Sequence, residues 1–245
     1  MQTKKKEKRM MLYPYVSVDC VLLGIDNERL CVLLVERKNA GAGITEYKLP
    51  GSLIYETEDL EEAAHRVLTE TTGLKRIQLK QFRSFGSPSR MENKDDVQWL
   101  EKDSKMKVGR IVTVGYLALC KVRKTKPGRD YFSKWTPVTQ LPRLPFDHKE
   151  IIEEAAKEIR TWIDVEPSIV FNYLPDKFTA LQLRRTYEII YNKVLDVRNF
   201  HKKMNSLGYV IQTNEMEQNV AHRSARYYRF DKVKYNQLRS KLNKS

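Results

Sequence analysis

The first part of the chain alternates between short apolar runs and one amphipathic segment. Apolar and β-branched residues fill positions 16–25 and 30–35, on either side of an Asp26-Asn27 turn signal, which predicts two strands. Within 58–72, apolar residues recur at i, i+3, i+4, i+7 and i+8, which predicts a helix with one buried face. Further strands are expected at 76–85 and 110–122, and a further helix at 148–162. This order predicts an α/β domain that ends near residue 165.

Residues 87–109 do not fit this pattern. They are polar and charged, contain Pro88 and show little periodicity. We therefore expect a long mobile loop between two strands of the α/β domain.

The pattern changes after Pro167. Thr179 followed by Gln182 is a capping box that predicts the start of a helix, and Asp196 is a suitable cap for a second helix that Gly208 ends. The second helix is expected to turn Val197, Phe200, Met204 and Leu207 inward. Two strand candidates follow at 209–213 and 225–230. Two helices joined by a tight turn and followed by a hairpin have the order of a winged helix-turn-helix.

Charge is distributed unevenly along the chain. The net charge is +14, of which residues 1–9 carry +4 and residues 166–245 carry +8, from fifteen basic and seven acidic side chains. A basic segment attached to a nearly neutral body indicates a polyanionic partner. A well-solvated surface accounts for the same numbers, so charge alone leaves both interpretations open.

Composition narrows the class of protein further. Hydrophobic residues make up 41% and charged residues 31%, which is typical of soluble globular proteins. We expect no membrane span, because no run of about 20 apolar residues is present, and a cytoplasmic protein, because no signal-peptide core follows the basic start. Cys20, Cys31 and Cys120 lie far apart in apolar runs and are expected to be buried, reduced thiols. We expect no metal and no cofactor.

Residues 49–74 resemble the Nudix box, whose family pattern is G-x5-E-x7-R-E-U-x-E-E-x-G-U, with U an aliphatic residue. The positions that fit this frame are Glu58, Arg66, Leu68, Glu70, Gly73 and Leu74. Ser52 stands where the pattern has its first glycine. The resemblance implies a Nudix α/β/α sandwich with a mixed sheet.

The departures from the pattern bear on catalysis. Val67 and Thr71 replace two of the three glutamates in the core R-E-U-x-E-E. In the family, these carboxylates hold the divalent cations that act on a pyrophosphate, and hard cations need several oxygen ligands. We therefore expect no catalytic residue, with Glu58, Arg66 and Glu70 remaining as a degenerate box. Residual hydrolysis with carboxylates from elsewhere stays open as an alternative.

The resemblance extends beyond the box, from about residue 12 to 240. The sequence around 165–167, 172–175, 178–191 and 198–200 resembles that of the Nudix-related transcriptional regulators. Among these, it most resembles the regulators of pentose use (arabinose or xylose) in Bacteroides-like bacteria. This implies a sensor domain, a C-terminal winged helix and a homodimer. The ligands known across the group include ADP-ribose and pentoses, so we expect a small-molecule effector of one of these kinds. Candidate ligand anchors, which flank the box or persist at family positions, are Arg37, Lys48, Arg90 and Arg110.

The second helix of the winged helix-turn-helix is expected to enter the major groove of double-stranded operator DNA. Its outward residues are Arg198, Asn199, His201, Lys202 and Lys203, and the hairpin adds Arg223 and Arg226. Arg198 and Asn199 are suited to reading guanine and adenine, whereas Lys202 and Lys203 are suited to phosphates. The alternative is that these are solvated surface cations.

We therefore predict a basic tail at 1–11, a Nudix-like sensor domain at 12–165 and a winged helix-turn-helix at 166–245. The function predicted is a ligand-responsive transcription regulator. The alternatives are a Nudix hydrolase of nucleoside diphosphate derivatives with an accessory domain, and a non-catalytic RNA- or protein-binding module.

Overall fold

The computed structural model describes residues 11–242 except 27, 38–45, 123–131 and 219–223. The chain divides into two compact units. The first comprises 1–22, 32–118 and 123–155, and the second comprises 23–31, 119–122 and 156–245. None of the described helices combines the length and the hydrophobicity that a membrane crossing needs.

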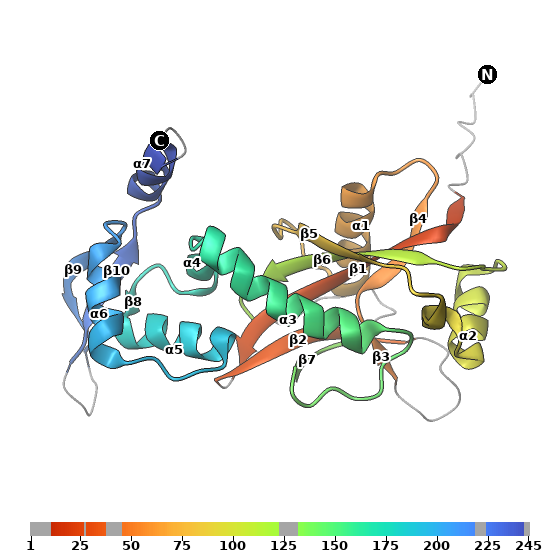
Figure 1. Ribbon diagram of the computed structural model, residues 1–245, viewed down its shortest axis with the longest axis horizontal. Helices are drawn as coiled ribbons and strands as arrows, with labels where there is room; N and C mark the ends of the chain where they lie inside the picture. The colour runs from red at the N-terminus through yellow and green to blue at the C-terminus, as the bar shows by residue number, and fades with distance from the viewer. Residues whose placement is uncertain (1–10, 27, 38–45, 123–131, 219–223, 243–245) are drawn as a thin grey trace, which may run out of the picture. The chain divides into compact units, whose positions relative to one another are not determined.

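A seven-stranded sheet forms the core of the first unit (Figure 1). Its strands are β1 (Leu12–Asp26), β2 (Arg29–Glu36), β3 (Tyr47–Lys48), β4 (Gly51–Tyr55), β5 (Lys80–Phe85), β6 (Val112–Leu119) and β7 (Ser133–Pro137). The order is β3-β2-β1-β6-β5, with β4 paired to β1 and β7 to β2. Every residue from Leu30 to Val35 is buried, which explains why β2 reads as a continuous apolar run and not as an alternating one.

Two helices bury apolar faces in this part of the fold. In α1 (Leu60–Thr72), which packs next to β4, the predicted stripe that includes Ala63, Ala64 and Val67 is buried. The helix ends at Gly73 with φ 71°, so the left-handed stop expected from the sequence is confirmed. α3 (His148–Val165) begins as predicted, and its first half crosses the sheet in Figure 1. The three cysteines are buried and free, as expected.

The prediction of a long loop at 87–109 is wrong. These residues contain a 3₁₀ turn, η1 (Pro88–Met91), and a helix, α2 (Lys94–Ser104). The side chain of Asn93 caps α2 by accepting hydrogen bonds from the N–H groups of Asp95 and Asp96. Only Asp96 and Trp99 are buried in this helix, so no apolar stripe marks it in the sequence.

The second unit contains the predicted helix-turn-helix and hairpin. Its elements beyond α3 are α4 (Ile169–Tyr173), β8 (Phe178–Thr179), α5 (Ala180–Tyr191), α6 (Val197–Ser206), β9 (Val210–Met216), β10 (Arg226–Phe230) and α7 (Lys232–Leu242). The strands form a sheet in the order β8-β10-β9. Aromatic rings fill its core, where Phe171 stacks on Phe230 with a centroid distance of 4.3 Å. No pattern in the sequence predicted α4, β8 or α7.

The caps of α5 and α6 agree with the sequence, but one residue of α6 that was expected to face inward does not. Thr179 and Gln182 form the predicted capping box of α5, and Asp196 caps α6 by accepting from the Asn199 N–H at 2.8 Å. Met204 is fully buried as predicted, whereas Val197 is 50% exposed. Val197 is the first residue of α6 and is absent from the lining of the groove against α5, so its expected inward position is wrong.

Candidate ligand cleft and DNA-binding surface

The degenerate box is organised around one arginine. The Arg66 guanidinium donates to Glu58 through Nε at 2.8 Å and Nη2 at 2.5 Å, and to the Leu53 carbonyl at 3.2 Å. It also donates to Glu70 at 3.2 Å. Burial alone would raise the pKa of Glu58, but the Arg66 guanidinium and the Tyr55 N–H outweigh it and lower that pKa. Both remaining box carboxylates are therefore held in ion pairs with Arg66.

The two substituted box positions cannot replace the missing carboxylates. Val67 has no exposed surface, and Thr71 is buried with its hydroxyl donating to the Val67 carbonyl at 2.7 Å. Among the described residues, no group of three or more His, Cys, Asp or Glu side chains is arranged to hold a metal ion. The two substituted positions therefore belong to the buried face of α1.

A cleft of about 270 Å³ lies beside the box within the first unit. Its ionisable lining residues are Asp19, Lys48, Arg66, Glu70, Arg90, Asp103 and His148. A smaller hollow of about 50 Å³ shares Lys48 and Glu70 with the cleft, and its wall includes Val67 and Thr71. The lost carboxylates would therefore have faced this space.

Asp19 is the centre of a buried polar network in the cleft. Its carboxylate accepts from the Thr113 hydroxyl at 2.7 Å and from Arg90 at 3.4 Å, and lies 3.5 Å from His148 Nε2. Burial would raise the pKa of Asp19, but His148, Arg90 and the Thr113 hydrogen bond outweigh it and lower the pKa. A Cβ at Gly51 would lie 1.9 Å from Asp19 Oδ1, so only glycine fits opposite this carboxylate.

His148 is neutral in this network near pH 7. Burial is the main reason that its pKa falls to about 4, although the Asp19 charge acts in the opposite direction. Its Nδ1 accepts the Leu49 N–H at 3.1 Å, which leaves the proton on Nε2, the nitrogen that faces Asp19. The imidazole thus joins the chain just before β4 to the start of α3.

Lys48 differs from the other cleft cations in its partners. Arg66 and Arg90 are each paired with two carboxylates, Arg90 with Asp19 and Asp147. The Lys48 ammonium donates instead to the carbonyls of Gly51, at 2.6 Å, and Leu49, at 3.4 Å. Burial lowers its pKa, with the Asp19 charge opposing that effect. Lys48 is therefore the cleft cation best placed to meet an anionic ligand.

The structure separates the four candidate ligand residues. Lys48 and Arg90 line the cleft, together with the buried Ser17, whose hydroxyl has no hydrogen-bond partner among the described residues. Arg37 is not in the lining, because its guanidinium is paired with Glu46 and Asp96 and stacked 4.4 Å from the Trp99 ring.

Arg110 also lies outside the cleft. It is exposed and donates to the Gly86 carbonyl at 2.6 Å. Sequence reasoning missed Trp99 and Asp103, which come from α2, the segment that was predicted to be a loop.

The candidate DNA-binding residues of α6 fall into two groups. Arg198 and Lys202 are exposed on the side away from the buried Met204, and His201 is half-buried beside them. Asn199 and Lys203 are exposed too, but they line a groove of about 510 Å³ against α5, next to Tyr187 and Tyr191. Of the hairpin candidates, Arg226 is exposed on β10, and Arg223 lies outside the described residues.

A buried carboxylate holds the turn between α5 and α6. Glu188 Oε1 accepts from the Leu195 N–H at 2.9 Å and from Arg184 at 2.5 Å, and Oε2 lies 3.5 Å from Arg185. Leu195 directly precedes Asp196, the cap of α6. The contact therefore fixes where α6 begins, and no sequence pattern indicated it.

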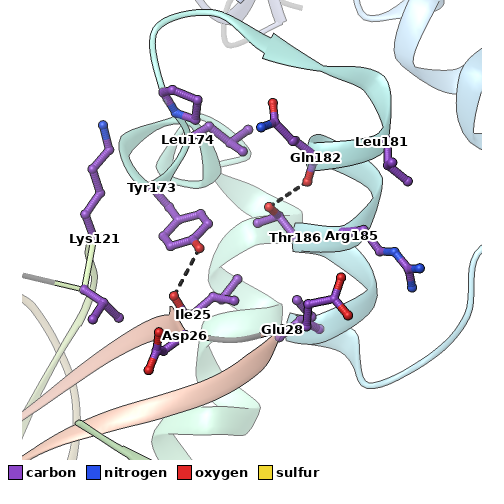
Figure 2. Close-up of a pocket in the computed structure, with 13 residues that line it drawn as sticks. Ile25, Asp26, Glu28, Lys121, Tyr173, Leu174, Leu181, Gln182, Arg185 and Thr186 are labelled. Carbon is purple, nitrogen blue, oxygen red and sulfur yellow. Dashed lines mark hydrogen bonds between the residues drawn. The ribbon is translucent and has the colours of Figure 1, made fainter. Parts of the chain in front are cut away.

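A further cavity, of about 600 Å³, lies within the second unit (Figure 2). Tyr173 borders one side, and its hydroxyl donates to the Ile25 carbonyl at 3.1 Å. α5 borders the other side with Gln182, Arg185 and Thr186. Charged side chains of both signs line this cavity, and the sequence did not point to it.

A family model described as the NUDIX domain matches residues 14–155, more than half of the chain. The chain belongs to the Nudix family. A second model, described as the NrtR DNA-binding winged helix domain, matches residues 170–230. A mixed-sheet Nudix domain followed by a C-terminal winged helix domain, the fold class expected from the sequence, is thus confirmed.

Three proteins that are similar to this Nudix chain are a repressor, a protein crystallised with DNA and a pyrophosphatase. The ADPR responsive transcriptional repressor NtrR of Acinetobacter baylyi is 27% identical over 223 residues, which are 89% of this chain and 82% of that protein. The crystal structure of Shewanella oneidensis NrtR complexed with a 27mer DNA is 25% identical with a TM-score of 0.63, covering 88% of this chain and 93% of that chain. The ADP-ribose pyrophosphatase of Methanocaldococcus jannaschii is 28% identical over 153 residues, 61% of this chain and 77% of that protein.

Proposed function

We propose that this chain is a DNA-binding transcription regulator whose Nudix domain senses ADP-ribose or a closely similar nucleotide-sugar. The observation that carries this proposal is the state of the box. Val67 and Thr71 stand buried where metal-binding glutamates are expected, yet the adjoining cleft is kept and polar. A Nudix domain of this kind is built to bind its ligand and not to cleave it.

The chemistry of the cleft suits such a ligand. Lys48 offers a desolvated ammonium to a pyrophosphate, where a charge-assisted hydrogen bond is strong. Glu70 and Asp103 line the same space and offer carboxylate oxygens to ribose hydroxyls. Positive and negative groups both line the wall, which matches a ligand that carries both phosphates and hydroxyls.

The winged helix domain supplies the output. α6 presents Arg198 and Lys202 to solvent from a helix whose start is fixed by Asp196 and Glu188. We propose that α6 enters the major groove, with Arg198 and Asn199 at base edges and Lys202 and Lys203 at phosphates. Arg226, with Arg223, would meet the backbone as part of the wing.

The name of the Acinetobacter relative supports ADP-ribose as effector and repression as the output. Pentoses form a second effector class, suggested by the resemblance of the sequence to arabinose and xylose regulators. We assign 1–11 to a tail, 12–165 to the sensor and 166–245 to DNA binding. We further propose a homodimer whose recognition helices lie about 34 Å apart on a near-palindromic operator. Such a regulator would act in the compartment that holds the DNA, the cytoplasm in a bacterium.

Gel-shift titration of the purified full chain on its own upstream region tests the proposal. Wild type is expected to prefer this DNA over random duplex, and ADP-ribose is expected to release it, while arabinose, xylose and AMP serve as comparison ligands. Lys202→Ala should weaken binding to every sequence and reduce the salt dependence by about 0.9 in the log–log slope. If wild type shows no preference for its upstream DNA over random duplex under any ligand condition, the proposal of a transcription regulator is overturned.

A hydrolase remains the second candidate, because the Methanocaldococcus relative is named as an ADP-ribose pyrophosphatase. Val67 and Thr71 argue against it. Magnesium-dependent release of AMP from ADP-ribose, measured on the same preparation, distinguishes the two functions.

A further inference from the structure

The first residue of α6 is an apolar side chain left open to solvent. Val197 is 50% exposed, although Met204 in the same helix is 1% exposed. The residues around it at this end of the helix are polar or charged, with Asp196 before it and Arg198 and Asn199 after it. Exposure of an isolated apolar residue is ordinary on a protein surface. Its position at the end of a candidate recognition helix makes this case different.

The helical repeat places Val197 among the DNA candidates. Residues at i, i+1, i+4 and i+5 share one side of an α-helix, so Val197 and Arg198 lie next to His201 and Lys202. Phe200 and Met204, at i+3 and i+7 from Val197, line the groove that faces α5, whereas Val197 is absent from that lining and is 50% exposed, so it lies at the border between the two sides. A protein or nucleic acid that contacts Arg198 and Lys202 would therefore also cover Val197.

Val197 is held in a defined position. The Asp196 carboxylate accepts the Asn199 N–H at 2.8 Å, and Glu188 holds the Leu195 N–H at 2.9 Å, so the chain is fixed on both sides of the residue. A β-branched side chain in a helix keeps essentially one χ1 rotamer. The two methyl groups of Val197 thus form a small rigid apolar surface at the helix start.

Among the base edges in the major groove, thymine presents an apolar group, the C5 methyl, which small apolar side chains contact. Recognition helices direct their N-terminal residues at base edges. We infer that Val197 packs against a thymine methyl group and selects thymine at one position of each operator half-site. The inference rests on the proposed DNA-binding function and adds a specificity-determining residue to it.

Replacing thymine by deoxyuridine, one position at a time, removes only the methyl group and tests the contact directly. Wild-type protein on its upstream operator is expected to lose affinity about fourfold at one position of a half-site, the effect of exposing roughly one methylene-sized group. Val197→Ala should bind the thymine and deoxyuridine operators equally at that position. Val194→Ala is the matched control, because Val194 is 90% exposed in the turn before α6 and the chemical change is the same.

The outcomes separate the two levels of the argument. If wild type does not prefer its operator over random duplex, both the proposed regulator function and the Val197 contact are overturned. If wild type binds the operator but Val197→Ala still loses affinity wherever thymine is replaced by deoxyuridine, the contact alone is overturned. The contact is also overturned if Val194→Ala no longer responds to that replacement. Val197→Thr keeps the β-branching and one methyl group, so a partial loss at the same position would support the contact even if the alanine variant binds too weakly to titrate.

Discussion

Replacing Lys48 by methionine tests the ligand cleft with little change in shape. Methionine keeps an unbranched apolar stem in a site where Lys48 lies 5.8 Å from the Trp99 ring centroid, and it removes the ammonium. The structure shows one strong donation, to Gly51 at 2.6 Å, which leaves a further N–H to meet a phosphate oxygen. A hydrogen bond to a charged partner contributes about 1.5–3 kcal/mol. The Kd for ADP-ribose should therefore rise about 10- to 150-fold.

Calorimetry on the full chain measures this effect, with thermal unfolding as a check that the variant is folded. Lys149→Met is the control, because Lys149 is exposed on α3 and the substitution removes a weak ion pair, with Lys149 Nζ 3.9 Å from Glu153 Oε1. The pH dependence gives a second test. Because burial lowers the pKa of Lys48 from 10.5, wild-type affinity should fall on the alkaline side at a pH below 10.5, and the Lys48→Met affinity should not. A folded Lys48→Met that binds ADP-ribose as tightly as wild type would refute the placement of the ligand.

Three further outcomes follow from the described contacts. Magnesium-dependent hydrolysis of ADP-ribose should stay below about 1 per second, and Val67→Glu should lower the melting temperature, because it places a carboxylate in a fully buried position. Glu188→Ala should cost about 1–3 kcal/mol of unfolding free energy by leaving the half-buried Leu195 N–H without its acceptor, and it should weaken specific DNA binding. Unchanged unfolding and binding would contradict its role in the turn. The pKa of His148, about 4 when folded against 6.5 ordinarily, should make the protein lose about 3 kcal/mol between pH 7 and pH 4, since only the unfolded state gains a proton there. His148→Asn should flatten this acid loss in denaturant titrations at several pH values.

Local signals in the sequence predicted those parts of the fold that local interactions determine. The stop at Gly73, the capping box at Thr179 and the cap at Asp196 depend on side chains within a few residues of the helix ends, and all three are present. β1 and β2 were recognisable because burial on both faces leaves continuous apolar runs, whereas β3, β4 and β7 were not predicted. These features need no knowledge of distant contacts.

The parts that sequence reasoning missed depend on contacts between distant residues. α2 has no apolar stripe, and its buried Asp96 is satisfied by Arg37, 59 positions away. The same pair removes Arg37 from the ligand cleft, although its position beside the box made it a candidate. Val197 fits the apolar period of α6, but periodicity does not show that this side chain is left 50% exposed. Burial at a helix end has to come from the three-dimensional structure.

The pattern of losses in the box has a physical explanation. Glu58 and Arg66 form a clamp that ties the segment after β4 to α1, since Arg66 also holds the Leu53 carbonyl at 3.2 Å and Glu58 accepts the Tyr55 N–H at 2.7 Å. These two box residues therefore stabilise the fold whether or not a metal binds. Val67 and Thr71 stand at the positions that would have served the metal alone, and both now contribute buried surface and a helix hydrogen bond. A Nudix domain can thus lose its metal-binding carboxylates while the clamp preserves the walls of the cleft, which is the arrangement that a ligand sensor requires.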